Sequence, residues 1–363
     1  MYSTSKILNG TIKLEGDKSL SHRLLMIASL IRGDSIVKNI SKSKDVYSTI
    51  KCLQKCNIDI DNQDEKTTIY QSNFIEPKGI LDCGNSGSTL RMLMGLLHGQ
   101  SISAKFNGDT SLQKRPMNRI MDPLKSMGAS FVSKNGTLPI EMKSKFIQSF
   151  NFIEETNSAQ VKTSLIFAGL GPESLSSIAY NKYTRDHTEK ILDDLGFNIK
   201  IYDTIKVKKS NISKGVDVLI PGDLSSAAFI IASAILIPNS KVTIRNVLYN
   251  KNRLTFIHTL IKMGADITVN NITDPDHGVQ SCDITAVYSK DLNGLTIDGG
   301  QVIAMIDEMP IFCIVACFAK GLTEIKNAKE LRLKESDRIH GIYENLDNIP
   351  SICSYVNWIS ESG

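Results

Sequence analysis

The chain has 363 residues, of which 41% are hydrophobic and 22% are charged, and its formal net charge is +4. These proportions are typical of a globular protein, and the length suits two domains. A charge of +4 is too small to indicate a polyanionic partner, and no apolar run reaches the ~18 residues of a membrane span. We therefore expect a protein that binds neither nucleic acid nor a membrane.

The N-terminal sequence MYSTSKILNGTIKLEG has neither the basic start nor the apolar centre of a signal peptide. This predicts a cytoplasmic protein. The closest cysteine pairs, Cys52/Cys56 and Cys313/Cys317, are four residues apart within apolar patterns and do not form a metal-type CxxC motif. We expect reduced thiols in the core and no metal site.

A repeated layout runs along the chain. GDKSLSHRLLMIASLIRGDSIVKNI starts at Gly16, and GDLSSAAFIIASAILIPNSKVTIRNV starts at Gly222. Each has Gly-Asp, small or hydroxylated residues, an apolar run of helical length, a polar turn and an alternating strand. Further copies begin at Gly84, Asn157 and Asp307, which makes five.

A second helix is predicted after most copies, because apolar residues recur there at three- and four-residue spacing. These predicted helices occupy 115–131, 184–199, 253–267 and 338–348. Three of them end in Gly, as a C-cap allows. Each copy then has the order strand, helix, strand, helix, strand, strand, and strand-helix-strand crossovers predict an α/β fold with parallel strands covered by helices.

The start of each copy has a composition that suits anion binding. Gly, Ser, Thr or Asn precedes a helix there, and the N-terminal N–H groups and dipole of a helix attract anions. For any single such loop, ordinary helix capping is the favoured explanation. However, eight basic residues lie in or just after these loops, and together they suggest the binding of one or two phosphate or carboxylate groups. They are Lys18, Arg23, Arg91, Arg115, Lys162, Arg185, Lys334 and Arg338.

No GxxxxGK[ST] or GxGxxG motif is present, so a nucleotide is not indicated. Carboxylates accompany the cations: Asp307 and Glu308 open the fifth copy, and KESDR covers 334–338. Paired charges on a solvated helix and general acid-base catalysis both explain this pattern.

Several motifs together resemble the EPSP synthase (3-phosphoshikimate 1-carboxyvinyltransferase) family, in its bacterial type II form. The motifs are GDKSLSHR, GNSGSTLR, GDTSLQKRPM, NSAQVKTSLIFAGL, TRDHTE, PGDLSSAAF and DEMPIFCIVACFAKGLTEIKNAKELRLKESDRI. The resemblance covers about residues 5–346. It implies a two-domain inside-out α/β barrel (EPT-like) built from βαβαββ units, of which five of six are recognised here. Residues 18–220 would form one domain, and 1–17 with 221–363 the second, which lacks its last unit.

The implied reaction transfers the enolpyruvyl group of phosphoenolpyruvate to the 5-hydroxyl of shikimate 3-phosphate and releases phosphate. It needs no cofactor and no metal, and we expect a monomer whose partners are these two small molecules. By matching motifs, shikimate 3-phosphate binding is assigned to Lys18, Ser19, Arg23, Ser158, Ala159, Gln160, Arg185, Asp307 and Lys334. Phosphoenolpyruvate binding is assigned to Lys18, Asn85, Gly87, Arg115, Gln160 and Arg338. Catalysis is assigned to Lys18, Asp307, Lys334 and Glu335.

Within this assignment Asp307 is the candidate base at the 5-hydroxyl and Glu335 the candidate acid at the methylene carbon, and which carboxylate moves which proton stays open. The family pattern continues through an Asp-His-Arg motif and a later lysine, and no DHR follows Arg338 in this sequence. Two alternatives therefore remain. One is a truncated homologue that only binds shikimate 3-phosphate. The other is a UDP-N-acetylglucosamine enolpyruvyl transferase, although Cys83 and the other cysteines do not lie in the loop which that enzyme uses.

Overall fold

The computed structural model describes residues 6–63, 65–144, 147–182, 184–333, 336–348 and 356–357. The chain forms two compact units. Unit 1 comprises Met1–Leu14, Pro221–Asp274 and Gln280–Gly363, and unit 2 comprises Glu15–Ile220 with Pro275–Val279. Residues 15–17 and 275–279 thus pack with unit 2, and the predicted domain boundaries stay a prediction.

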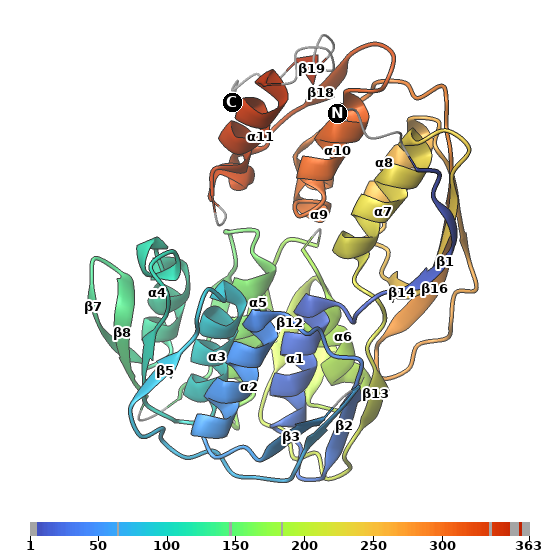
Figure 1. Cartoon of the computed structure of the whole chain (residues 1–363). Coiled ribbons are helices and arrows are strands. Elements are labelled where there is room, and N and C mark those ends of the chain that lie inside the picture. Colours follow the sequence, from blue (N-terminus) through green and yellow to red (C-terminus); the bar gives the residue numbers. More distant parts are fainter. Residues whose placement is uncertain are drawn as a thin grey trace. The chain divides into compact units, whose positions relative to one another are not determined.

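Unit 2, drawn from blue to light green in Figure 1, contains three copies of one βαβαββ arrangement. The first copy consists of β13 (Asp217–Leu219), α1 (Lys18–Ala28), β2 (Ser35–Lys38), α2 (Lys44–Lys55), β3 (Ile60–Gln63) and β4 (Lys66–Ile69). The second consists of β5 (Ile80–Asp82), α3 (Gly87–Gly99), β6 (Ala104–Asn107), the 3-10 turn Leu112–Lys114, α4 (Asn118–Ser126), β7 (Ser130–Lys134) and β8 (Thr137–Lys143). The third consists of β9 (Asn151–Ile153), α5 (Ala159–Gly169), β10 (Ser176–Ala179), α6 (His187–Asp194), β11 (Ile199–Ile201) and β12 (Thr204–Val207).

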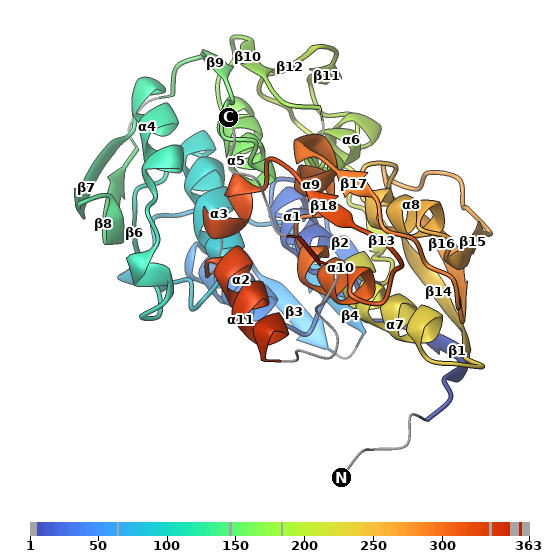
Figure 2. The same cartoon turned by 90° about the horizontal axis from the view of Figure 1, so that it is seen from above.

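Each copy has its own four-stranded sheet, in the orders β13-β2-β4-β3, β5-β6-β8-β7 and β11-β12-β10-β9. The strands on either side of the first helix are parallel, as in β5 and β6, whereas the last two strands are antiparallel. The predicted order and the parallel crossovers are confirmed. In the described residues of unit 2 the three sheets remain open and do not close into one barrel, and Figure 2 shows them around a group of helices that includes α1, α3 and α5.

The first helix of each copy, α1, α3 or α5, lies in the interior of unit 2. These helices are apolar on nearly all sides, and Leu24, Leu93 and Ile166 are completely buried. Gly95 lets α3 approach α5 closely, since a Cβ atom there would lie 2.0 Å from the carbonyl oxygen of Ser164. A larger residue at this position would force the two helices apart.

The predicted second helices exist as α4, α6, α8 and α11. Gly128, Gly196 and Gly264, which follow three of them, have φ values of +107°, +79° and +101°, so the C-cap prediction is confirmed. Helix α2 was not among the predicted helices, although it is amphipathic and the Ser43 hydroxyl caps its first turn.

Unit 1 contains the other two copies. One consists of β1 (Asn9–Lys13), α7 (Leu224–Leu236), β14 (Lys241–Tyr249), α8 (Thr255–Lys262), β15 (Asp266–Asn270) and β16 (Gln280–Val287). The other consists of β17 (Thr296–Ile297), α9 (Gly299–Ala304), α10 (Met309–Ala316), β18 (Thr323–Ile325), the 3-10 segment Lys329–Leu333, α11 (Arg338–Asp347) and β19 (Val356–Asn357). Ile231, Phe256 and Phe312 are completely buried in one apolar core shared by both copies.

Three expectations about composition can be compared with the described residues. Six cysteines there are free and buried, as predicted for core thiols. The described helices include none that is long and apolar enough to cross a membrane. No group of three or more His, Cys, Asp or Glu side chains in the described ranges is arranged to hold a metal ion.

Candidate functional site

Three helix starts in unit 2 are capped in the same way. The Asp17 carboxylate accepts a hydrogen bond from the N–H of Leu20 at 2.8 Å, ahead of α1. The Ser86 hydroxyl caps α3 and the Ser158 hydroxyl caps α5. Each cap satisfies one N–H group and leaves the other N–H groups of the first turn available to an acceptor. The capping and anion-binding interpretations of these loops are therefore compatible.

Arg185, which precedes α6, lies at the start of α1. Its guanidinium donates a hydrogen bond to the Ser19 hydroxyl at 2.7 Å, across 166 residues of sequence. Both residues were assigned to shikimate 3-phosphate from the sequence, and the fold brings them together. A guanidinium beside a helix N-terminus provides both a fork of donors and a positive dipole end for an anion.

Arg23, one turn further along α1 than Ser19, is only 3% exposed. Its guanidinium donates to the hydroxyls of Thr188 at 2.9 Å and Thr163 at 3.2 Å, and to the carbonyl oxygen of Ser19 at 2.9 Å. These contacts tie α1 to α5 and α6. The predicted substrate contact of Arg23 stays a prediction, whereas its hydrogen bonds show that it positions Ser19.

Lys18 is the first residue of α1, and its side chain is 46% exposed. Its ammonium forms an ion pair of 3.1 Å with Asp45 in α2. The sequence reasoning did not consider Asp45. An exposed ion pair of this kind is weak, so an arriving anion can compete with Asp45 for the ammonium.

A second group of polar residues lies at the loop before α3. Arg115 donates to the Asn85 side-chain oxygen at 2.9 Å, and the Asn85 amide donates to Asp109 at 2.6 Å. Hydrogen bonds from the N–H of Leu112 and from Asn85 lower the pKa of Asp109. Asn85 and Arg115, both assigned to phosphoenolpyruvate, therefore meet in the fold, and Asp109 orients Asn85.

Gly87 and Gln160 are connected to each other by Arg91. The Arg91 guanidinium donates to the Gln160 side-chain oxygen at 2.6 Å, and the Gln160 amide donates to Ser88 at 2.8 Å. A Cβ atom at Gly87 would lie 2.7 Å from Arg91 and 3.4 Å from Arg115. A side chain at this position would therefore displace the Arg91 guanidinium. Arg91, which the residue assignment omitted, belongs to this group.

Lys162 does not join the other basic residues in binding an anion, and that part of the sequence interpretation is wrong. Its ammonium lies 2.6 Å from the Glu189 carboxylate, and both side chains are 0% exposed. The Tyr180 ring centroid lies 4.6 Å from the same ammonium. Burial raises the pKa of Glu189 and the neighbouring Lys162 opposes this shift. Lys162 is buried because its position on α5 faces α6.

A buried chain of hydroxyls connects His22 to the start of α3. The His22 Nδ1 atom lies 2.7 Å from the Thr49 hydroxyl, which lies 2.7 Å from the Thr89 hydroxyl. The Thr89 hydroxyl donates to Ser86 at 2.7 Å. Burial lowers the pKa of His22 to about 3, helped by the charges of Lys18 and Arg23. His22 is therefore neutral at physiological pH and supports the helix starts without adding charge.

Unit 1 holds a separate group of charged residues around Asp307, whose side chain is 35% exposed. Arg338 donates to its carboxylate at 3.1 Å and to the carbonyl oxygen of Ile306 at 2.8 Å. Arg253 lies 4.0 Å from the same carboxylate and 3.0 Å from the buried Glu308. The fold thus brings together Asp307, which was assigned to shikimate 3-phosphate, and Arg338, which was assigned to phosphoenolpyruvate.

Sequence reasoning missed Arg253 and gave Glu308 no separate role. The Ser225 hydroxyl donates to Glu308 at 2.6 Å, and Arg253 donates to that hydroxyl at 2.8 Å, so the three form a buried polar group behind Asp307. The Asp-Glu pair was visible in the sequence, but nothing marked Arg253 as its partner. Lys334 and Glu335, two assigned catalytic residues, lie outside the residues that the structure describes.

Among family models, the one described as EPSP synthase (3-phosphoshikimate 1-carboxyvinyltransferase) matches residues 2–353. The 3-phosphoshikimate 1-carboxyvinyltransferase of Persephonella marina is 39% identical over 351 residues, which is 94% of this chain and 81% of that protein. The protein of the same name from Thermodesulfovibrio yellowstonii is 40% identical over 351 residues, with the same coverage of 94% and 81%.

Solved structures give a consistent result. EPSP synthase from Acinetobacter baumannii superposes with a TM-score of 0.83 at 33% sequence identity, covering 94% of this chain and 79% of that one. The enolpyruvyl transferase NikO from Streptomyces tendae has a TM-score of 0.70 at 14% identity and covers 88% of this chain and 75% of that one. The second likeness supports the fold alone, and both agree with the predicted EPT-like architecture.

Proposed function

The chain belongs to the EPSP synthase family, and on that premise we propose that it transfers the enolpyruvyl group of phosphoenolpyruvate to the 5-hydroxyl of shikimate 3-phosphate. Phosphate is the second product, and the step belongs to aromatic amino acid biosynthesis. The observation that carries the proposal is the hydrogen bond from Arg185 to Ser19 at the start of α1. It sets a guanidinium fork beside a helix N-terminus, and both features favour the binding of a phosphate group.

The two substrates carry phosphate and carboxylate groups, so most of the assigned residues serve binding. Shikimate 3-phosphate is proposed to bind to Ser19, Arg185 and the start of α5 at Ser158–Gln160. Arg23 fixes Ser19 through its hydrogen bond to the Ser19 carbonyl oxygen. Asn85, Gly87, Arg115 and Gln160 are proposed to hold phosphoenolpyruvate. Lys18 serves both substrates, after it exchanges its Asp45 partner for a substrate anion.

The chemistry needs three proton transfers, two in the addition step and one in the elimination step. A proton added to the methylene carbon of phosphoenolpyruvate makes C2 electrophilic, and the 5-hydroxyl adds to C2 as it loses its own proton. The tetrahedral intermediate then expels phosphate and loses a methyl proton to restore the double bond. Family resemblance assigns Asp307 as the acceptor of the hydroxyl proton, and the guanidinium of Arg338 at 3.1 Å favours the charged carboxylate, the form that can accept a proton. Glu335 and Lys334 are assigned by family resemblance alone.

The test is phosphate release by the purified 363-residue chain with both substrates, with each substrate omitted in turn. We expect turnover that depends on both. Calorimetric titration with shikimate 3-phosphate alone separates binding from chemistry. Binding without turnover would favour the alternative of a homologue that only binds shikimate 3-phosphate, and turnover with UDP-N-acetylglucosamine as acceptor would favour the other alternative.

Two substitutions test the assigned roles. Arg185→Gln should weaken shikimate 3-phosphate binding by about tenfold or more, because it removes a charged hydrogen-bond donor. Lys190→Gln is the matched control, since it removes an exposed cation from α6 that pairs with Asp186. Asp307→Asn should lower kcat by about 10²–10⁴-fold while shikimate 3-phosphate still binds. If Arg185→Gln and Lys190→Gln weakened shikimate 3-phosphate binding equally, the assignment of Arg185 to the phosphate would be refuted.

The proposal includes a cytoplasmic monomer. Light scattering of the purified chain at several concentrations measures the oligomeric state, and a mass near 40.1 kDa is expected. A larger mass that persists on dilution would contradict the monomer.

A further inference from the structure

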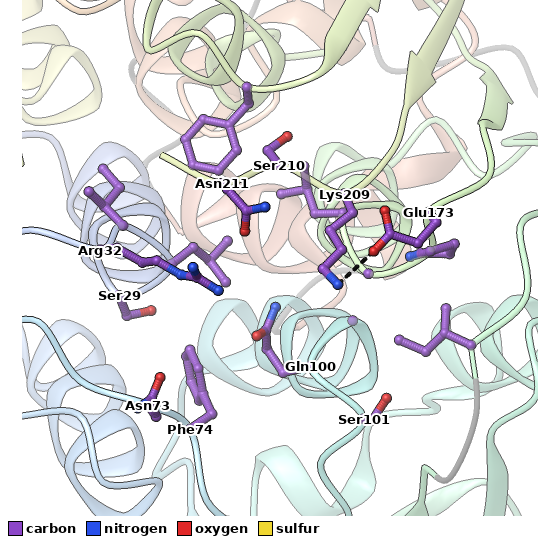
Figure 3. Close-up of a pocket in the computed structure, with 18 of the residues that line it drawn as sticks. Ser29, Arg32, Asn73, Phe74, Gln100, Ser101, Glu173, Lys209, Ser210 and Asn211 are labelled. Carbon is purple, nitrogen blue, oxygen red and sulfur yellow. Dashed lines mark hydrogen bonds and ion pairs between the residues drawn. The ribbon is translucent and has the colours of Figure 1, made fainter. Parts of the chain in front are cut away.

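Unit 2 contains a cavity of about 800 Å³ at the end of α1, α3 and α5 opposite to the helix starts (Figure 3). Each of the three repeats contributes the segment after its first helix and the segment after its last strand. The lining comprises 29–32, 72–74, 99–101, 147–149, 170–174, 197 and 209–211. We call it the helix-end cavity. With 11 residues in α1, it lies about 16 Å from Lys18 along that helix.

The repeats are similar in fold, but the chemistry that they bring to the cavity differs. The first repeat supplies Arg32 and Phe74, the second supplies Gln100, and the third supplies the ion pair of Lys209 and Glu173, at 2.8 Å. A cavity that merely followed from the symmetry of three repeats would not require such different side chains. The volume lies within the 300–1,000 Å³ range of small-molecule sites.

The anion-binding part of the cavity is Arg32. Figure 3 shows its side chain extending toward Gln100 and Asn211, with Lys209 on the far side. Within the described ranges, the Arg32 guanidinium makes no hydrogen bond or ion pair, and its backbone N–H is fixed to the carbonyl oxygen of Ile212 at 2.7 Å. A guanidinium flanked by two side-chain amides provides donors for a carboxylate.

A cation is favoured elsewhere in the same cavity. The C-cap residues of helices α1, α3 and α5 line the cavity, so three C-terminal dipole ends, each worth roughly −0.5 charge, face this region; these residues are Ser29, Gln100 and Leu170. The Glu173 side chain is 82% exposed and is paired with Lys209, so it adds no net charge to the field of the helix ends. This negative field disfavours a simple anion and favours a ligand that also carries an ammonium group.

An apolar wall completes the lining. Phe74 lies below Arg32 and Gln100 in Figure 3, and Phe197 and Ile147 also line the cavity. Phe197 is 6% exposed and therefore fixed by packing. Aromatic and aliphatic side chains of this kind bind the flat apolar body of a ligand.

We propose that the helix-end cavity binds a zwitterionic α-amino acid with an aromatic side chain, whose carboxylate pairs with Arg32 and whose ammonium faces the helix C-termini. The ring packs on Phe74 and Phe197. Within unit 2 this site lies at the end of α1 opposite to Lys18, and the inference does not depend on the proposed function.

The experiment is calorimetric titration of the full chain with three probes that share a phenylethyl group. L-phenylalanine carries both charges, 3-phenylpropionate lacks the ammonium and 2-phenylethylamine lacks the carboxylate. We expect saturable binding of L-phenylalanine and at least about tenfold weaker binding of the other two. Equal binding of 3-phenylpropionate would show a plain anion site, and equal binding of 2-phenylethylamine a cation site. Either result, or no binding of L-phenylalanine, would overturn the proposal.

Variants locate the binding. Arg32→Gln should weaken L-phenylalanine binding by about tenfold or more, and Arg32→Lys by less, because lysine keeps the charge but loses the fork. Arg245→Gln, which removes an exposed cation from β14 in unit 1, should leave binding unchanged. Gln100→Leu gives a second perturbation within the cavity. Unchanged affinity in both Arg32→Gln and Gln100→Leu would place the binding elsewhere and refute the inference. Phosphate release should stay at the level of the unmodified chain in Arg32→Gln.

Discussion

The buried ion pair between Lys162 and Glu189 provides the sharpest prediction about the stability of unit 2. The charged atoms lie 2.6 Å apart and both side chains are 0% exposed. At an effective dielectric constant of about 20 their attraction is on the order of 6 kcal/mol, and desolvation of the two charges costs a similar amount. The pair is therefore close to neutral as a whole, whereas either charge alone is strongly unfavourable.

Lys162→Met should accordingly lower the free energy of unfolding by about 3–5 kcal/mol at pH 7, because it leaves the Glu189 carboxylate buried without a partner. The double variant Lys162→Met/Glu189→Leu should recover most of that loss. The measurement is urea unfolding followed by circular dichroism. Lys190→Met is the matched control: this lysine is 49% exposed, and its loss should cost less than about 1 kcal/mol.

The pH dependence gives a second readout of the same pair. In Lys162→Met the folded-state pKa of Glu189 should rise further, since burial already raises it and the opposing lysine is gone. A carboxyl with a raised folded pKa destabilises the fold increasingly as the pH rises above its unfolded value, so the loss should be smaller at pH 5 than at pH 8. A loss below about 1 kcal/mol, or one equal to that of Lys190→Met, would refute the reasoning.

Three further predictions concern the helix starts. Gly87→Ala should raise the KM for phosphoenolpyruvate several-fold in steady-state kinetics, because the new Cβ atom would lie 2.7 Å from Arg91 and displace it; an unchanged KM would contradict this. Asp45→Asn should tighten shikimate 3-phosphate binding up to about fivefold in low salt, because Lys18 loses a competing partner worth at most ~1 kcal/mol, and the gain should shrink in high salt. The folded pKa of His22 is about 3, below the ordinary value of 6.5, so the free energy of unfolding should fall as the pH drops below 6.5. His22→Asn should flatten this pH dependence in urea titrations. An equally steep dependence in the variant would exclude His22 as its source.

Much of the fold followed from local patterns. Four complete βαβαββ copies, their parallel crossovers and the glycine C-caps at Gly128, Gly196 and Gly264 were predicted correctly, because each depends on residues close together in sequence. In the fifth copy the described residues form only a three-stranded parallel sheet, β17-β18-β19. The prediction omitted α2, whose apolar face is short and whose start is marked mainly by Ser43. It also omitted the packing of 275–279 with unit 2, which depends on contacts distant in sequence.

The sequence by itself determined the family, the repeated architecture and which loops carry cations at helix starts, because long motifs and helix periodicity depend on residues that are close together in the sequence. Only the tertiary structure decided what each cation does. Arg185 contacts Ser19 and Arg91 contacts Gln160, whereas Lys162 is neutralised by Glu189 inside the core. The helix-end cavity was equally invisible in the sequence. Its lining comes from six separate segments and one further residue, and their proximity follows from how three repeats pack side by side.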